Sequence, residues 1–180
     1  MSTPTHETEP RRTQDDPIEL RSHVAGDIGW ILQRHGELYE AGYQLGPRFE
    51  ALVAKILSDF ALDHDPEHER LWIAHRSGQR LGSVMLVRED AETARLRLFL
   101  VEPEARGLGL GTRLMSTLLD FTRRVGYRRI VLTTIDELDA ARRIYERVGF
   151  RVHDTTRHHD WSVPVVEEEW SLDLTDPAAP

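Results

Sequence analysis

One glycine-rich run constrains this chain more than any other stretch: Arg106-Gly107-Leu108-Gly109-Leu110-Gly111-Thr112. An alternating apolar segment precedes it and a long amphipathic segment follows, which predicts a strand, a loop and a helix. Because glycines lack a Cβ, the N–H groups of such a loop can approach a bulky anion closely. The first turn of the helix adds unpaired N–H groups and the positive end of its dipole. The run therefore predicts a pyrophosphate site, with Arg106 as a charged donor.

Three other interpretations of the run have to be compared with this one. Taken alone, the glycines could simply form a surface turn that caps a helix. A phosphate-binding P-loop would require Gly-Lys-Ser or Gly-Lys-Thr, whereas Gly111 is followed directly by Thr112. A dinucleotide fingerprint has the spacing G-x-G-x-x-G near the start of a βαβ unit, whereas this loop has G-x-G-x-G after predicted antiparallel strands. The remaining pattern is Arg/Gln-x-x-Gly-x-Gly/Ala, matched by Arg106, Gly109 and Gly111.

Length and composition indicate one globular domain. The 180 residues suffice for a single core. Residues 1–16 are polar apart from Met1, so we expect a disordered leader there, a domain over 17–175 and a short tail over 176–180. We find neither an apolar signal segment nor a membrane span, and expect a cytoplasmic protein. The net charge of −8 disfavours a nucleic-acid partner. The absence of cysteine excludes an acyl-cysteine intermediate.

Hydrophobic periodicity predicts an α/β fold with one mixed sheet of about seven strands and helices on both faces. The segment 34–40, between the first two helices, is polar and is predicted to be a loop that could line an acceptor pocket. Pro103 cannot donate to a sheet ladder, so it ends the strand before the glycine loop. The predicted strands are 18–24, 71–74, 81–87, 96–101, 129–134, one starting at 150, and 165–174. The predicted helices run from about 27 to 35, from Pro47 to about 60, from 109 to 125 and from 140 to 148.

Three motifs in this order resemble the GCN5-related N-acetyltransferases, the GNAT superfamily. They are the strand 96–101 with Glu102-Pro103, the loop Arg106 to Gly111, and the late segment 140–150 with Tyr145, Gly149 and Phe150. The resemblance covers about residues 18–174 and implies the GNAT fold. More narrowly, residues 26–30 and 34–36 with His158-His159 and Trp170 resemble the acetyltransferase halves of MarR-type regulator fusions. No winged-helix half precedes them, so we expect no DNA binding.

The GNAT resemblance implies acetyl-CoA as co-substrate and specific residues to hold it. The backbone of two residues at the end of the central strand would pair with the pantetheine arm, as if the arm were an added strand. The loop residues would hold the pyrophosphate. Asp139 stands near a position where many relatives have an Asn that contacts the cofactor, and an Asp there would put a charge close to an anion. The implied cofactor-binding residues are Leu100, Val101, Arg106, Gly107, Leu108, Gly109, Leu110, Gly111 and Thr112.

For the chemistry, the resemblance implies that Tyr145 lies near the cofactor sulfur as a catalytic acid. A phenol of pKa ~10 could donate to the departing thiolate. At helical spacing from Ile144 and Val148, the same tyrosine could instead be a core residue. A backbone N–H near Leu100 or Val101 would meet the oxyanion.

The base that deprotonates the amine is not evident from the sequence. The candidates are Glu37, Glu40, His35, His158 and His159. We expect no metal: Pro66 breaks the helix that would align His64 with His68, and His158 and His159 would point apart on a strand.

The sequence thus predicts an N-acetyltransferase that transfers acetyl from acetyl-CoA to a primary amine of a small molecule or peptide, by direct attack in a ternary complex. The alternative is a non-catalytic module of the same fold that senses acyl-CoA or serves in an interaction. A homodimer is one oligomeric state open to it.

Overall fold

The computed structural model describes residues 16–175, so the expected tail and all but Asp16 of the expected leader lie outside the described residues. Its centre is a seven-stranded sheet in the order β1-β2-β3-β4-β5-β7-β6. β4 and β5 are parallel and the other neighbours are antiparallel, as expected for a mixed sheet. The strands are β1 (Glu19–Ser22), β2 (Arg70–Arg76), β3 (Gln79–Arg88), β4 (Thr93–Val101), β5 (Arg129–Ile135), β6 (Arg151–His158) and β7 (Val165–Asp173).

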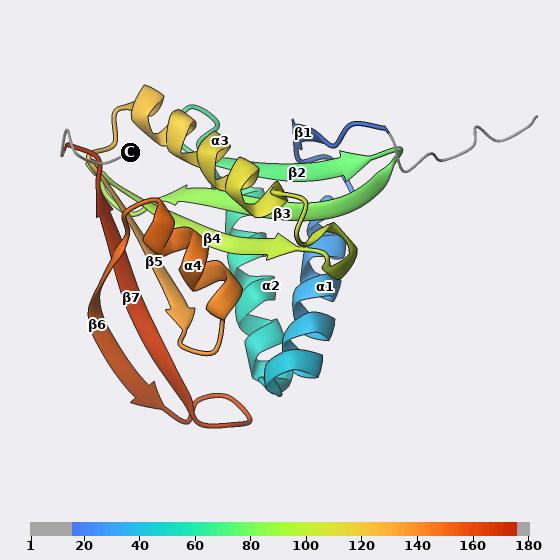
Figure 1. Cartoon of the computed structure of the whole chain (residues 1–180), viewed down its shortest axis with the longest axis vertical. Helices are drawn as coiled ribbons and strands as arrows, with labels where there is room; N and C mark the ends of the chain where they lie inside the picture. The colour runs from blue at the N-terminus through green and yellow to red at the C-terminus, as the bar shows by residue number, and fades with distance from the viewer. Residues whose placement is uncertain (1–15, 176–180) are drawn as a thin grey trace, which may run out of the picture.

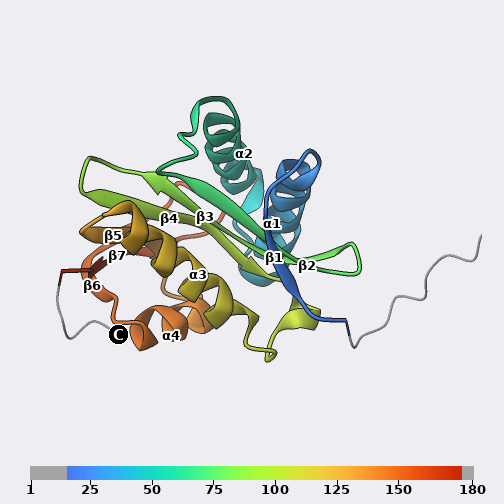
Figure 2. The ribbon, with the colours of Figure 1, turned by 90° about the horizontal axis from the view of Figure 1, so that it is seen from above.

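Helices cover both faces of the sheet, as the sequence predicts. α1 and α2 lie on one face, and α3 and α4 on the other (Figures 1 and 2). Each face has its own apolar cluster. α1 and α2 contribute Ile31, Val53 and Leu57 to one cluster, and α3 contributes Leu114, Met115 and Leu118 to the other. The helices are α1 (Asp27–Tyr43), α2 (Gly46–Asp63), α3 (Leu110–Val125) and α4 (Asp139–Arg147), with a short 3-10 helix at Pro103–Ala105.

The first helix is longer than the sequence analysis expects, and the prediction of a loop over residues 34–40 is wrong. α1 continues from Asp27 to Tyr43, through the polar segment and through Gly36. The helix ends where Gln44 takes a left-handed φ of 56° and donates its N–H to Glu40 O at 3.0 Å. Packing of the buried face against α2 and β4 outweighs the low helix propensity of glycine. Of residues 34–40, His35, Leu38 and Tyr39 line the cavities described below, and they do so from a helix.

A bulge in β4 splits the sheet in the middle. Ser83 pairs with Leu100 while Met85 pairs with Arg97, so two residues of β4 oppose one of β3. Leu98 takes a φ of +48° there, and its carbonyl accepts a hydrogen bond from Ser83 Oγ at 3.2 Å. β4 pairs with β5 only over Thr93–Arg95, and the strands then diverge, as Figure 1 shows. Beyond Arg95, the β5-facing edge of β4 therefore has no strand partner within residues 16–175.

A buried carboxylate joins three elements at the other end of the sheet. Asp27, at the start of α1, is fully buried and accepts hydrogen bonds from Arg21 of β1 and Arg80 of β3, both at 2.6 Å. It also accepts the N–H of Val24 at 2.7 Å. Burial works to raise the pKa of Asp27, but these hydrogen bonds outweigh it and hold the pKa well below its ordinary value. No helix in the described part of the chain has the length and apolarity needed to cross a membrane.

Candidate functional site

Two neighbouring cavities lie near the point where β4 and β5 diverge. The glycine loop forms part of the wall of the larger one. It has a volume of about 670 Å³. Eight of the nine residues predicted to bind the cofactor line it, and the ninth, Leu108, is 57% exposed outside it. Asp139 is absent from the lining and lies 3.8 Å from Arg142, to which it forms an ion pair. The loop and β4 contribute Leu100, Val101, Arg106, Gly107, Gly109, Leu110, Gly111 and Thr112 to the lining.

The loop has the geometry of an anion cradle. Gly107 and Gly109 take φ angles of +77° and +74°, which L side chains rarely adopt, and a Cβ at either would meet open space. Gly109 is the N-cap of α3, and no side chain caps that helix. The first N–H groups of α3 thus point out of the helix end without an internal partner. These features fit a pyrophosphate held by backbone N–H groups, with Arg106 beside it.

A second cavity of about 270 Å³ lies on the α1 and α2 side of the same split. Its walls are mainly apolar side chains, among them Leu45, Phe49, Ile56 and Trp161. Polar side chains in the wall are His35, Arg97, Thr133, Thr134, Tyr145 and Glu167. Four residues line both cavities, namely Tyr39, Phe99, Leu138 and Ala141. The two cavities are therefore neighbours, and we call these four residues the junction.

Tyr145 is a buried residue and also faces the smaller cavity. Its ring contacts Phe99, Phe150 and Trp170, with centroids about 6 Å away in each case. It follows Ala141 by one helical turn, which puts both on the same side of α4 near the junction. Burial, with a smaller effect from Tyr39, raises the pKa of Tyr145 well above its ordinary value. The phenol is protonated at neutral pH.

The five candidate bases are placed very differently. Glu37 pairs with Arg34, and Glu40 accepts the N–H of Gly46 at 2.8 Å. His158 lies 3.5 Å from Glu167, and His159 is exposed. Only His35 lines a cavity.

A buried ion pair fixes α1 against the end of β4. Arg34 donates from Nε and Nη2 to the two oxygens of Glu102, each at 2.7 Å, and Glu102 is 3% exposed. This two-point geometry is the strong form of an arginine–carboxylate pair. It holds the end of α1, including Tyr39 and Tyr43, as a wall of the larger cavity.

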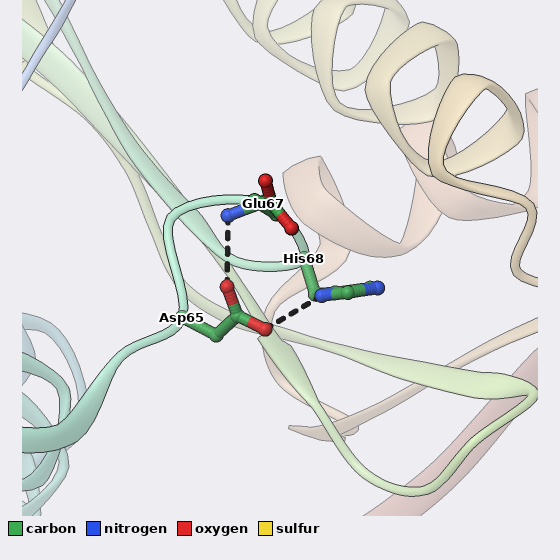
Figure 3. A group of neighbouring side chains, drawn as sticks. All are labelled: Asp65, Glu67 and His68. Atoms are coloured by element: carbon green, nitrogen blue, oxygen red, sulfur yellow. Dashed lines mark hydrogen bonds and ion pairs between the residues drawn. The ribbon is translucent and has the colours of Figure 1, made fainter.

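Residues of the turn after α2 gather metal-compatible groups. One ligand atom from each of Asp65, Glu67 and His68 lies within 4.8 Å of the others (Figure 3). Asp65 accepts the N–H of Glu67 at 2.9 Å and contacts His68 Nδ1 at 2.6 Å, which accounts for the arrangement as a turn held by its own aspartate. α2 ends at Asp63, before Pro66. The expectation that the protein uses no metal stays a prediction.

Several residues at the junction are missed by the sequence analysis. Tyr39 belongs to no motif, Arg97 and Phe99 lie in the motif strand 96–101 but have no predicted role, and the bulge that turns Leu98 has no signature in the sequence. One signal was available: His35, Tyr39 and Tyr43 follow one another at four-residue spacing. That spacing predicts one face of a helix.

Comparison with known proteins gives close agreement in fold and moderate agreement in sequence. A GCN5-related N-acetyltransferase from Kribbella flavida superposes with a TM-score of 0.69 at 26% identity, covering 87% of this chain and 98% of that one. An acetyltransferase from Salmonella typhimurium, solved with its cofactor acetyl-CoA, superposes with a TM-score of 0.69 at 20% identity over 91% of this chain and 98% of that one. At that identity, the second likeness concerns the fold alone.

Two curated relatives are N-acetyltransferases by name. An uncharacterized N-acetyltransferase of Schizosaccharomyces pombe is 26% identical over 129 residues, covering 62% of this chain and 79% of its own length. A probable N-acetyltransferase camello of Xenopus tropicalis is 32% identical over 116 residues, covering 61% of this chain and 53% of its own length. The chain thus spans about half of the second relative. The family model described as Acetyltransferase (GNAT) family matches residues 32–150, and the chain belongs to this family of acetyl-CoA-dependent acetyltransferases.

Proposed function

We propose that this protein transfers the acetyl group of acetyl-CoA to a primary amine of a small molecule or peptide. In this proposal the larger cavity holds the co-substrate and the smaller cavity holds the acceptor. The single observation that carries it is the junction, where Tyr39, Phe99, Leu138 and Ala141 line both cavities. Two reactants held there would be brought together in one ternary complex, which converts a bimolecular step into a local one.

The proposed residues act on the co-substrate in two places. Gly107, Gly109 and the first turn of α3 would hold the pyrophosphate through backbone N–H groups, with Arg106 adding charge. The unpaired edge of β4 at Leu100 and Val101 would hold the pantetheine arm by main-chain hydrogen bonds. Acetyl-CoA supplies the activated acyl group.

The proposed reaction is a direct attack. The amine nitrogen bonds to the acetyl carbon, the carbon–sulfur bond breaks, and the nitrogen loses its proton to solvent. A backbone N–H at the end of β4 would stabilise the oxyanion. Tyr145 would donate a hydrogen bond to the departing sulfur, and the thiolate would then take up a proton from solvent. A free thiol has a pKa of ~8.5. Because the pKa of Tyr145 is raised well above that of a thiol, the phenol keeps its proton. We therefore expect a charge-assisted hydrogen bond from Tyr145 to the thiolate.

The alternative is an acyl-CoA-sensing module without turnover. The lowered pKa of His35 favours it, because it makes His35 a weak base and none of the other four candidate bases lines either cavity. The likeness to the acetyltransferase halves of MarR-type regulators likewise remains a proposal from the sequence.

Thiol release separates the two functions. The protein is mixed with acetyl-CoA and a panel of primary amines, and free CoA is measured with a thiol reagent. We expect amine-dependent CoA release, and we expect Tyr145→Phe to lower kcat by about 10- to 100-fold with little change in KM for acetyl-CoA. Binding of acetyl-CoA by calorimetry without CoA release for any amine would support the sensor instead. Equal rates for the two proteins would return Tyr145 to a structural role.

A further inference from the structure

Arg97, in the wall of the smaller cavity, carries a positive charge that no described side chain contacts directly. Arg97 of β4 is half-buried in that wall, and among the described residues its guanidinium makes no hydrogen bond and no ion pair within 4 Å. Glu89, Glu167 and Glu169 attract Arg97 over a longer range without contacting it. Each of them has a closer partner: Glu89 and Glu169 flank Arg95, and Glu167 lies 3.5 Å from His158. A partly desolvated cation in this position gains from an anion that enters the cavity.

The same cavity contains a buried hydrogen-bond acceptor without a donor. His35 is 2% exposed, and its Nδ1 lies 2.9 Å from the carbonyl oxygen of Ile31. A carbonyl only accepts, so Nδ1 carries the hydrogen and Nε2 carries the lone pair. Among the described residues, Nε2 has no hydrogen-bond partner. Burial lowers the pKa of His35 to about 4, which keeps this ring neutral and the lone pair free at pH 7.

Both His35 and Arg97 lie close to the junction residues. The His35 ring stacks on Tyr39, with centroids 5.5 Å apart, and Tyr39 lines both cavities. Arg97 precedes the junction residue Phe99 by two positions on β4. His35 therefore lies beside the place where acyl transfer is proposed, and Arg97 is close to the same place along β4.

The remaining walls select for a small apolar body. Phe49 and Trp161 meet edge to face at 5.4 Å, and Leu98 and Ile56 complete an apolar surface. At ~30 Å³ per water molecule, the volume of about 270 Å³ holds a group the size of a substituted benzene ring.

From these observations we infer that the acceptor is a compact amine with an apolar body and an anionic group, most simply a carboxylate. Arg97 pairs with the anion, and His35 Nε2 accepts an N–H of the amine. This inference rests on the proposed function, because it names the acceptor of that same site. The opposite preference, for a second cation, would use Glu167 in the same wall.

The test uses pairs of amines that differ only in charge. The probes are 4-(aminomethyl)benzoate, its benzamide, and the matching diamine 4-(aminomethyl)benzylamine, together with 6-aminohexanoate and its amide. In each pair the varied group lies far from the amine, so the amines are similarly basic. Turnover is measured as CoA release, and binding is measured by calorimetry on the protein saturated with CoA, where no transfer can occur.

Two variants assign the contacts. We expect Arg97→Gln to lower kcat/KM for the carboxylates by about 10- to 100-fold, with less than about a threefold change for the amides. His35→Phe keeps the ring but removes the lone pair, so it should lower kcat/KM for carboxylate and amide alike. Arg128→Gln is the control, because Arg128 is exposed beside Glu92 and lines neither cavity. Thermal melts check that each variant is folded.

The outcomes separate this inference from the proposed function. A preference for carboxylates that Arg97→Gln abolishes supports the inference. If the amides or the diamine are turned over as well as the carboxylates, the inference is overturned and the acetyltransferase proposal stands. If carboxylates bind in an Arg97-dependent way but no CoA is released, the inference is supported and the proposed catalysis fails. If none of the amines binds or reacts, the inference is overturned.

Discussion

At the scale of single residues, the site depends on polar groups held away from water. His35, Tyr39 and Tyr145 are grouped around the junction of two cavities, and burial shifts the pKa of each toward its neutral form. A neutral histidine can accept a hydrogen bond and a neutral phenol can donate one. The junction is thus prepared for a polar reaction without carrying a fixed charge of its own.

His35 also makes the stability of the fold depend on pH. Its pKa is about 4 in the folded chain and ~6.5 in an unfolded one. Between these values the unfolded chain binds a proton that the folded chain does not, so stability falls as the pH drops from about 7 to 4, by about 3 kcal/mol in all. We expect His35→Phe to remove this part of the dependence, measured by urea unfolding at several pH values.

The control for this effect is His159→Phe. His159 is exposed after the end of β6, so its replacement should leave the pH dependence as it is in the unaltered protein. An unchanged acid slope in His35→Phe would contradict the assignment.

At the scale of elements, a loop, a bulge and a helix end position the site. Gly109 takes a left-handed conformation at the start of α3, and Gly78 takes a similar one, φ +78°, in the turn between β2 and β3. Neither glycine has an atom close to where a Cβ would lie. The two positions share the same backbone requirement, and only one of them lines a cavity.

This pair gives a matched test of the loop. Alanine at either position should cost about 1 kcal/mol of stability, because an L residue is strained at positive φ. Only Gly109→Ala should weaken acetyl-CoA binding, by about tenfold or more, since its methyl group would stand where backbone N–H groups must approach the pyrophosphate. Calorimetry with acetyl-CoA measures the affinity. Equal affinity in both variants would separate the loop from the cofactor.

Some of these elements can be predicted from the sequence and others cannot. The apolar face of α3, its end at Gly126 and the run of strands are local patterns, and the structure confirms them. The predicted length of α1 was wrong, because packing of its buried face on distant residues outweighs the low helix propensity of Gly36. The bulge at Leu98 follows from pairing with β3, and Arg97 faces a cavity only because β4 and β5 separate. Such features depend on contacts between remote segments, which no short window of sequence contains.

At the scale of the whole molecule, the sheet has two parts joined by a short parallel contact. β1 to β4 form one part and β5 to β7 the other, and they pair over only three residues of β4. The smaller cavity lies between these parts, since residues of β4, β5 and β7 line it, and the larger cavity adjoins it through the four junction residues. Within the first part, Asp27 connects β1, α1 and β3 through Arg21 and Arg80.

Asp27→Asn should destabilise the whole fold. Two arginines would lose their carboxylate partner, and loss of one member of a buried ion pair costs about 3 kcal/mol. Because the pKa of Asp27 is lowered in the folded protein, the carboxylate stabilises the fold above about pH 4, and its contribution is lost as the pH falls further. Urea unfolding at pH 7 measures the difference, which should shrink below pH 4.

Asp59→Asn is the control for Asp27→Asn. Asp59 pairs with Lys55 at 2.6 Å on the surface of α2, where both side chains are mostly exposed. Such a pair contributes at most about 1 kcal/mol. Equal losses in the free energy of unfolding would mean that the buried Asp27 stabilises the fold no more than an exposed aspartate does.

The two cavities share only four lining residues, and each opens to solvent. With one reactant in each cavity, as proposed, neither has to pass through the cavity of the other, so a bound reactant leaves the route of the second one clear. The two substrates can then bind in either order. Double-reciprocal plots of initial rate should intersect, whereas an enzyme that forms a covalent acyl intermediate would give parallel lines.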